Sequence, residues 1–232
     1  TAVEVVYELK GQNEYGFKIV GSYDPQLTLV IDPALSTLSA STYLGGTGND
    51  RGFCLALDNS GHVYVAGYTL SSTADFPTTD GAYDRTYHGG YDLFVSRFSS
   101  DLKTLEASTY FGGAGTDYLY SMALDSAGYV YLAGATSSND FPIISGAFQA
   151  VYQGGEYDGF VAKLSGDLST LLASTFLGGS GTDQPASLIL DSSFNIYLTG
   201  TTSSADFPVT PGAYSQVYKG GYDVFVAGLS NS

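Results

Sequence analysis

One pattern of six residues occurs three times along the chain and constrains the fold more than any other feature. The segment Ser41 to Gly46 reappears at Ser108 and at Ser174, which gives spacings of 67 and 66 residues. Each copy is followed, in the same order, by an apolar run ending in Asp, a Val-Tyr-Val-Ala-Gly-like run, Asp-Phe-Pro and Tyr-Asp-x-Phe-Val. A period of this length indicates a supersecondary unit that buries its faces by stacking on neighbouring copies.

Each copy contains four strand-like runs rich in Val, Tyr, Phe, Leu and Thr, separated by Gly, Asp, Asn and Ser. No window shows a sustained apolar period of 3.6 residues, so we expect almost no helix. Turns such as Asp58 to Gly61 join the second and third runs as tight hairpins, whereas a stretch of about 23 residues separates the third and fourth runs. The sequence therefore predicts an all-β fold of four-stranded antiparallel blades, as in β-propellers, with three long loops on one face.

The charge balance excludes some classes of partner. The 232 residues include 23 acids and only 8 bases, for a net charge of −15, and no basic stripe is visible. We expect a nucleic-acid backbone or an anionic membrane surface to be repelled. No apolar run is long enough to span a bilayer, so we predict no membrane span.

The repeated residues resemble those of the bacterial SBBP family, a seven-bladed β-propeller repeat. The resemblance covers about residues 38–230 and rests on Ser-Thr-Tyr-Leu-Gly-Gly, Val-Tyr-Val-Ala-Gly, Asp-Phe-Pro and Tyr-Asp-x-Phe-Val. It implies an extracellular or cell-surface propeller without general enzymatic activity. We predict an N-terminal β segment over residues 1–37 and three repeats over residues 38–232. Thr1 to Glu4 do not read as a signal peptide, so any targeting segment is expected upstream of residue 1.

The number of blades is the open question at this stage. By analogy with other propellers, blades start near residues 49, 116 and 182, so the third blade lacks an outer strand. The strand predicted over Ser39 to Leu44 either completes that blade if a ring closes or ends a degenerate first blade. The other strands of such a degenerate blade would be Val3 to Leu9, Tyr15 to Val20 and Leu27 to Ile31. The alternatives are a four-bladed ring, an open fragment of a longer propeller, and completion by another chain through strand exchange.

Aspartates recur at fixed positions in every copy and have two interpretations. One is a Ca²⁺ site, because hard cations prefer carboxylate and carbonyl oxygens on Gly-rich loops. The other, which we take as the default, is that each Asp caps its own turn. The candidate Ca²⁺ ligands are Asp50, Asp58, Asp117, Asp125, Asp183 and Asp191.

Aromatic residues of the long loops also have two interpretations. We expect Phe76, Phe141 and Phe207 of the Asp-Phe-Pro motifs to fill the gaps between blades rather than stack on a sugar or peptide. The candidate contact surface for a protein or carbohydrate consists of Tyr83, Tyr87, Phe148, Tyr152, Tyr214 and Tyr218.

The catalytic inventory is small. Cys54 lies in an apolar run where the other copies have Ser, and His62 and His88 are not repeated. We therefore predict a structural or interaction module that is not an enzyme, with itself or other surface proteins as partners. The alternative is a surface module that binds Ca²⁺ or carbohydrate, and a hydrolase or lyase using Asp residues of a central channel is the least favoured hypothesis.

Overall fold

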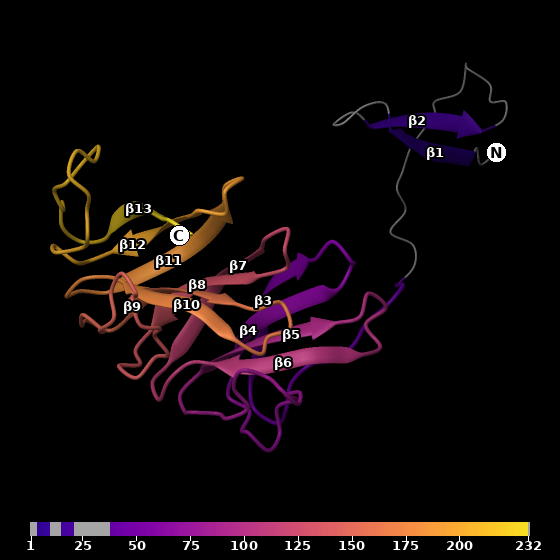
Figure 1. Ribbon diagram of the computed structural model, residues 1–232, viewed down its shortest axis with the longest axis horizontal. Coiled ribbons are helices and arrows are strands. Elements are labelled where there is room, and N and C mark those ends of the chain that lie inside the picture. Colours follow the sequence, from indigo (N-terminus) through magenta and orange to yellow (C-terminus); the bar gives the residue numbers. More distant parts are fainter. Residues whose placement is uncertain (1–3, 10–14, 21–37, 232) are drawn as a thin grey trace. The chain divides into compact units, whose positions relative to one another are not determined.

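The computed structural model of the chain describes residues 4–9, 15–20 and 38–231 (Figure 1). It divides into two compact units, Thr1–Ser39 and Ala40–Ser232. In the first unit, β1 (Glu4–Leu9) pairs antiparallel with β2 (Tyr15–Val20), so two of the strands predicted there form. The third, Leu27 to Ile31, lies outside the described residues, and the degenerate first blade stays a prediction.

The second unit consists of three antiparallel sheets, which we name blades 1, 2 and 3. Blade 1 has the order β3 (Asp50–Leu57), β4 (Val63–Thr69), β5 (Asp92–Phe98) and β6 (Leu105–Phe111). Blade 2 has the order β7 (Asp117–Leu124), β8 (Val130–Thr136), β9 (Asp158–Leu164) and β10 (Leu171–Leu177). Blade 3 contains β11 (Asp183–Leu190), β12 (Ile196–Thr202) and β13 (Asp223–Leu229). The blade starts predicted near residues 49, 116 and 182 are confirmed, and the described residues contain no helix that could cross a membrane.

The hairpin turns form because one Asp side chain organises each of them. Asp58 Oδ1 accepts the backbone N–H groups of Ser60 and His62, at 2.8 and 2.9 Å. Asp125 and Asp191 make the same pair of bonds in the other blades. An Asp that satisfies two turn N–H groups fixes where one strand ends and the next begins.

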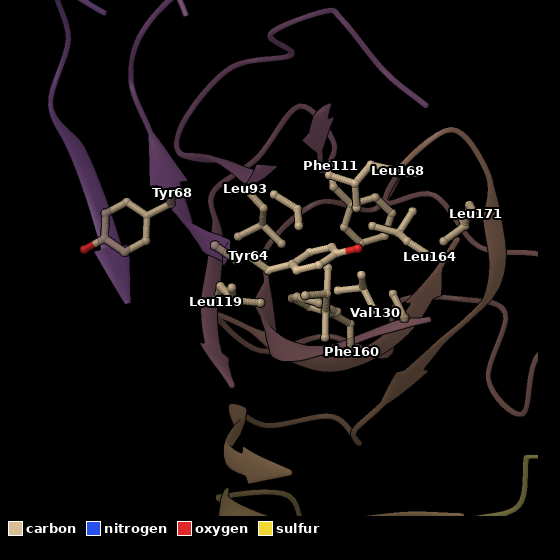
Figure 2. Packing of buried hydrophobic residues seen from close by; sticks show 14 of the residues in the cluster. Tyr64, Tyr68, Leu93, Phe111, Leu119, Val130, Phe160, Leu164, Leu168 and Leu171 are labelled. Carbon is tan, nitrogen blue, oxygen red and sulfur yellow. The ribbon is translucent and has the colours of Figure 1, made fainter. Parts of the chain in front are cut away.

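The core lies at the junctions between blades. Tyr64, Leu93 and Phe111 of blade 1 pack against Leu119 and Phe160 of blade 2, as Figure 2 shows. The inner strands β3 and β7 lie side by side, as do β7 and β11. A second cluster, which includes Val161 and Leu188, joins blades 2 and 3. Burying both faces of blade 2 in this way supplies the main driving force for the array.

Phe141, from the Asp-Phe-Pro motif of blade 2, fills the gap between blades 1 and 2, as predicted. The ring of Phe141 lies 5.0 Å from Phe111 of blade 1 and 4.6 Å from Phe160 of blade 2. Phe76 packs on Phe94 and Tyr110 of its own blade, and Phe207 packs on Phe225. Each of these rings therefore packs on the phenylalanine of the third strand of its own blade, namely Phe94, Phe160 or Phe225.

The prediction of a strand over Ser39 to Leu44 is wrong for the single chain. The structure assigns no strand to residues 38–49, because within the described residues this segment has no neighbouring strand to pair with. In the part of the chain that the structure describes, blade 3 has three strands and no outer strand, as predicted.

Candidate interaction site at the edge of the third blade

The outer edge of β13 has no strand partner in the part of the chain that the structure describes. In blade 1, β5 pairs with β4 on one side and β6 on the other, and in blade 2, β9 pairs with β8 and β10. The corresponding strand β13 pairs with β12 alone. Its outer row of backbone N–H and C=O groups can therefore accept a further strand.

A groove of about 1190 Å³ runs beside this edge. Blade 3 lines it with Phe207, Tyr218 and Phe225, and blade 2 contributes Thr175 and Leu177. Two candidate contact residues from the long loops, Phe148 and Tyr214, also line the groove and are 60% and 107% exposed. The lining combines apolar and aromatic surface with polar backbone at its rim, which suits an extended peptide segment.

The aromatic floor of the groove is formed by two stacked rings. The centroids of Phe207 and Phe225 lie 4.6 Å apart, with 29° between the ring planes. In blade 1 the matching pair is Phe76 and Phe94, and Tyr110 of the outer strand lies over it, 5.4 Å from Phe76. In blade 2, Phe176 of the outer strand lies 6.0 Å from Phe141 in the same way.

One of the residues that line the groove, Tyr218, is a loop tyrosine with an equivalent in each blade. The hydroxyl groups of Tyr87, Tyr152 and Tyr218 donate to the carbonyl oxygens of the glycines three residues later, at 2.6, 3.1 and 2.6 Å. Tyr87 and Tyr152 also pack on the outer-strand rings of their blades. The third loop is thus held in the same conformation as the other two, although its blade has no outer strand in the described residues.

The six predicted contact residues do not form one surface. Tyr83 packs against the core between blades 1 and 2, and its backbone N–H donates to the carbonyl oxygen of Leu168. Tyr87 and Tyr152 support their own loops. The structure brings Phe148, Tyr214 and Tyr218 together at the groove. This group was not distinguished in the sequence because the three loops carry similar residues.

The two outer faces of the array carry exposed apolar side chains. On blade 3, Val224 and Val226 are 74% and 78% exposed, whereas Leu93, the blade 1 counterpart of Val224, and Val161, the blade 2 counterpart of Val226, are 0% and 3% exposed. On the opposite side of the array, Leu55 of blade 1 is 73% exposed, whereas its counterpart Leu188 in blade 3 is 5% exposed. These positions are the two halves of a blade junction, and each is without its partner half in the described residues.

The predicted Ca²⁺ ligands occupy two separate levels of the blades. Asp50, Asp117 and Asp183 begin the inner strands, and each accepts the N–H of a preceding glycine through Oδ2. Asp58, Asp125 and Asp191 follow the same strands and cap the hairpin turns. Eight residues of strand place the two levels about 26 Å apart. In the described ranges, no three metal-ligating side chains gather in a group that could hold an ion, and the Ca²⁺ site stays a prediction.

Another set of aspartates is buried where blades meet. Asp92 and Asp158 are fully buried, and the Oδ1 atom of each has no hydrogen-bond partner among the described residues. A Cβ at Gly178 would lie 2.8 Å from both Asp158 Oδ1 and Asp183 Oδ2, so these two carboxyl groups flank the same glycine. Burial, with the charge of Asp183 adding to it, raises the pKa of Asp158 to about 7. Burial likewise raises the pKa of Asp92 to about 7.

Antiparallel four-stranded sheets that repeat along the chain and pack face to face define a protein built of β-propeller blades. Residues 108–142 and 174–208 match the SBBP family, whose description is beta-propeller repeat. The resemblance seen in the sequence is confirmed for these two copies.

The chain is also similar to Regulatory protein FlaEY of Caulobacter vibrioides. The two are 28% identical over 193 residues, which is 82% of this chain and 19% of that relative. The chain therefore spans about a fifth of the length of the curated relative it matches.

Proposed function

We propose that this chain is an extracellular or cell-surface structural and interaction module that self-assembles by strand pairing at the open edge of blade 3. The observation that carries the proposal is the edge strand β13 beside a groove with an aromatic floor. Addition of a strand to such an edge supplies main-chain hydrogen bonds, and the groove selects the alternate side chains. The resemblance to SBBP repeats supports the surface location, and the module acts by binding rather than by catalysis.

Sedimentation velocity over a range of protein concentrations tests self-assembly. Val226→Lys places a charge on a side chain that is 78% exposed next to the open edge, so the fold tolerates it while strand addition is opposed. Ser145→Lys, in an exposed loop of blade 2, is the matched control because it makes the same change of charge. We expect concentration-dependent association for the unsubstituted chain and for Ser145→Lys, and a marked loss for Val226→Lys. A chain that stays monomeric at high concentration contradicts self-assembly.

A second candidate function is carbohydrate binding in the same groove. The exposed rings of Phe148 and Tyr214 favour it, because aromatic faces on a rim stack on sugar rings. A glycan array with the unsubstituted chain and with Tyr214→Ala tests it. Binding that Tyr214→Ala removes supports this function, and an array without signal counts against it.

A further inference from the structure

We infer that the segment Ala40–Leu44 of a second copy of this chain is the strand that fills the groove, with Tyr43 on the ring pair of Phe207 and Phe225. The inference rests on the proposed self-assembly and names its donor segment, its register and its contact residues. It starts from the observation that the described residues contain both an unfilled outer-strand position, beside β13, and an unpaired segment with an outer-strand sequence, Ala40–Leu44.

The sequence of Ala40–Leu44 matches that of the outer strands β6 and β10 at every position in residue type. Ser41, Thr42 and Tyr43 correspond to Ser108, Thr109 and Tyr110 of β6. In β10 the same positions are Ser174, Thr175 and Phe176. Both of those strands are paired, and their aromatic residues, Tyr110 and Phe176, are 0% and 1% exposed. Tyr43 is 102% exposed. The same position of the repeat is therefore buried where its strand is paired and exposed in Ala40–Leu44.

One residue of the donor segment, Leu44, already makes the contact expected from its place in the repeat. Leu44 packs against Phe76, Phe94 and Tyr110 of blade 1. This contact reproduces that of Phe111 with Phe141 and Phe160 of blade 2. In a strand, neighbouring side chains point to opposite faces. Leu44 thus faces the blade that follows it, and Tyr43 faces the place of a blade that precedes it.

The register follows from the pairs in the complete blades. Phe94 pairs with Tyr110 and Val95 with Thr109 in blade 1, and Phe160 pairs with Phe176 in blade 2. The same register places Tyr43 opposite Phe225 and Thr42 opposite Val226. The Tyr43 ring then enters the groove beside Phe207 and Tyr218, where it continues the stack.

The long loop of blade 3 has the backbone groups that this strand needs. In blade 1, the Tyr110 N–H donates to the carbonyl of Asp84, whose own N–H donates to Thr109 Oγ1. Gln149 has the same two bonds with Phe176 and Thr175 in blade 2. The corresponding residue in blade 3 is Ser215. Its carbonyl oxygen would accept the N–H of Tyr43, and its N–H would donate to Thr42 Oγ1. The Tyr110 hydroxyl donates to the carbonyl of Ser71, so the Tyr43 hydroxyl would reach Ser204, the equivalent residue.

The outer faces of the array support a second copy as the donor. A copy that supplies Ala40–Leu44 to blade 3 also brings its blade 1 against the exposed face of blade 3. Leu55 and Leu57 would then cover Ile189, Val224 and Val226, which are 65 to 78% exposed in the single chain. The contact repeats the junctions found between blades 1 and 2 and between blades 2 and 3.

The resulting contact is head to tail, because donor and acceptor are different parts of the chain. Two copies of three sheets give six blades when both contacts form, a number within the range of four to eight found in propeller rings. We therefore expect a closed dimer in which each copy gives one strand and receives one.

Complementation between two variants tests the inference. Tyr43→Ser impairs the donor strand without affecting the fold of the single chain, because Tyr43 is fully exposed. Val226→Lys impairs the acceptor edge. We expect each variant alone to associate at least about tenfold more weakly than the unsubstituted chain. An equimolar mixture should form a one-to-one dimer through one intact contact, because the donor of Val226→Lys meets the acceptor of Tyr43→Ser, whereas the second contact carries both substitutions and stays open. Tyr43→Phe should keep most of the affinity, because a phenylalanine, Phe176, occupies the same position in the outer strand of blade 2 and packs near Phe141.

The outcomes separate this inference from the proposed function. If the unsubstituted chain and Tyr43→Ser associate equally while Val226→Lys does not, the edge is used but Ala40–Leu44 is not the donor. If the mixture forms no dimer, the donor assignment is also wrong. If the unsubstituted chain is monomeric at every concentration, both proposals fail. A monomer that still binds a synthetic peptide of residues 38–46 overturns the second copy as donor and assigns the groove to another repeat of this type.

Discussion

Phe207 and Phe225 stack with their centroids 4.6 Å apart although no third ring from the described residues lies over them. Phe207 comes from the long loop and Phe225 from β13, so the acceptor is already formed in the single chain. A preformed acceptor lowers the ordering cost of binding, which favours strand addition at this edge.

Phe141 and Phe207 are equivalent in the repeat but differ in burial. Their replacement by alanine should therefore lower the free energy of unfolding by different amounts. Phe141→Ala should cost about 3–5 kcal/mol of unfolding free energy, since Phe141 is buried among rings of two blades. Phe207→Ala should cost roughly half of that, because Phe207 is partly exposed at the open groove. Urea unfolding at low protein concentration measures both values. Equal losses would mean that the groove is covered in the single chain.

The buried carboxyl groups predict that stability declines toward neutral pH. The pKa of Asp158, raised to about 7, favours the protonated form in the folded state. Its contribution is therefore complete below the ordinary pKa of 3.8 and is lost as the pH rises through about 7. Asp158→Asn mimics the protonated group and should stabilise the protein by at least about 1 kcal/mol at pH 8, with little effect at pH 4.

Asp167→Asn is the control for that experiment because its shift has the opposite sign. Hydrogen bonds from Ser165 and Ser169 lower the pKa of Asp167. Its contribution is present above the ordinary pKa and lost as the pH falls, so Asp167→Asn should destabilise the protein at neutral pH. Thermal melting between pH 4 and pH 8 compares the two variants. A melting temperature of Asp158→Asn that parallels the unsubstituted chain at every pH would contradict the prediction.

A tyrosine hydroxyl links blade 1 to blade 2. Tyr64 donates to the carbonyl oxygen of Gly166 at 2.8 Å, and Arg97 Nη1 donates to the same atom at 2.9 Å. Tyr64→Phe should cost about 1 kcal/mol. Its counterpart Tyr197 is 46% exposed on the outer face of blade 3, so Tyr197→Phe should change stability by less than about 0.5 kcal/mol. Chemical denaturation distinguishes the two, and a larger loss for Tyr197→Phe would be inconsistent with this assignment of the junction.

The capping aspartates offer a test of the Ca²⁺ hypothesis. Asp125 accepts the N–H groups of Ala127 and Tyr129 and the hydroxyl of Tyr131. Asp125→Ala should cost about 1–3 kcal/mol, and the loss should be the same with excess Ca²⁺ and with chelator. A loss that appears only in Ca²⁺ would show instead that this aspartate ligates the ion.

The sequence was sufficient to predict the blades, because their boundaries depend on local chemistry. Asp58 and its two equivalents cap hairpins, and the alternation of Val and Tyr in β4 marks a strand with two different faces. Phe141 was also predicted to lie between blades, since its motif recurs once in each repeat.

The open groove could not be predicted in the same way. Ser41 to Leu44 has the composition of a strand, and only the arrangement of the blades shows that it has no partner within the described residues. The burial of Asp92 and Asp158 is equally invisible in the sequence, where they resemble the exposed loop aspartates. Long-range contacts, rather than residue type, decide both features.

The offset between repeat and blade also bears on how such proteins change in length. Each repeat contributes its first strand to one blade and its other three to the next, as Ser108 to Phe111 and Asp117 to Leu164 do here. The first strand of a duplicated repeat thus pairs within the sheet of the preceding repeat. Deletion of a whole repeat leaves every remaining sheet with the same number of strands. Gain or loss of a whole repeat therefore changes the number of blades and leaves the strand pairing within each remaining blade unchanged.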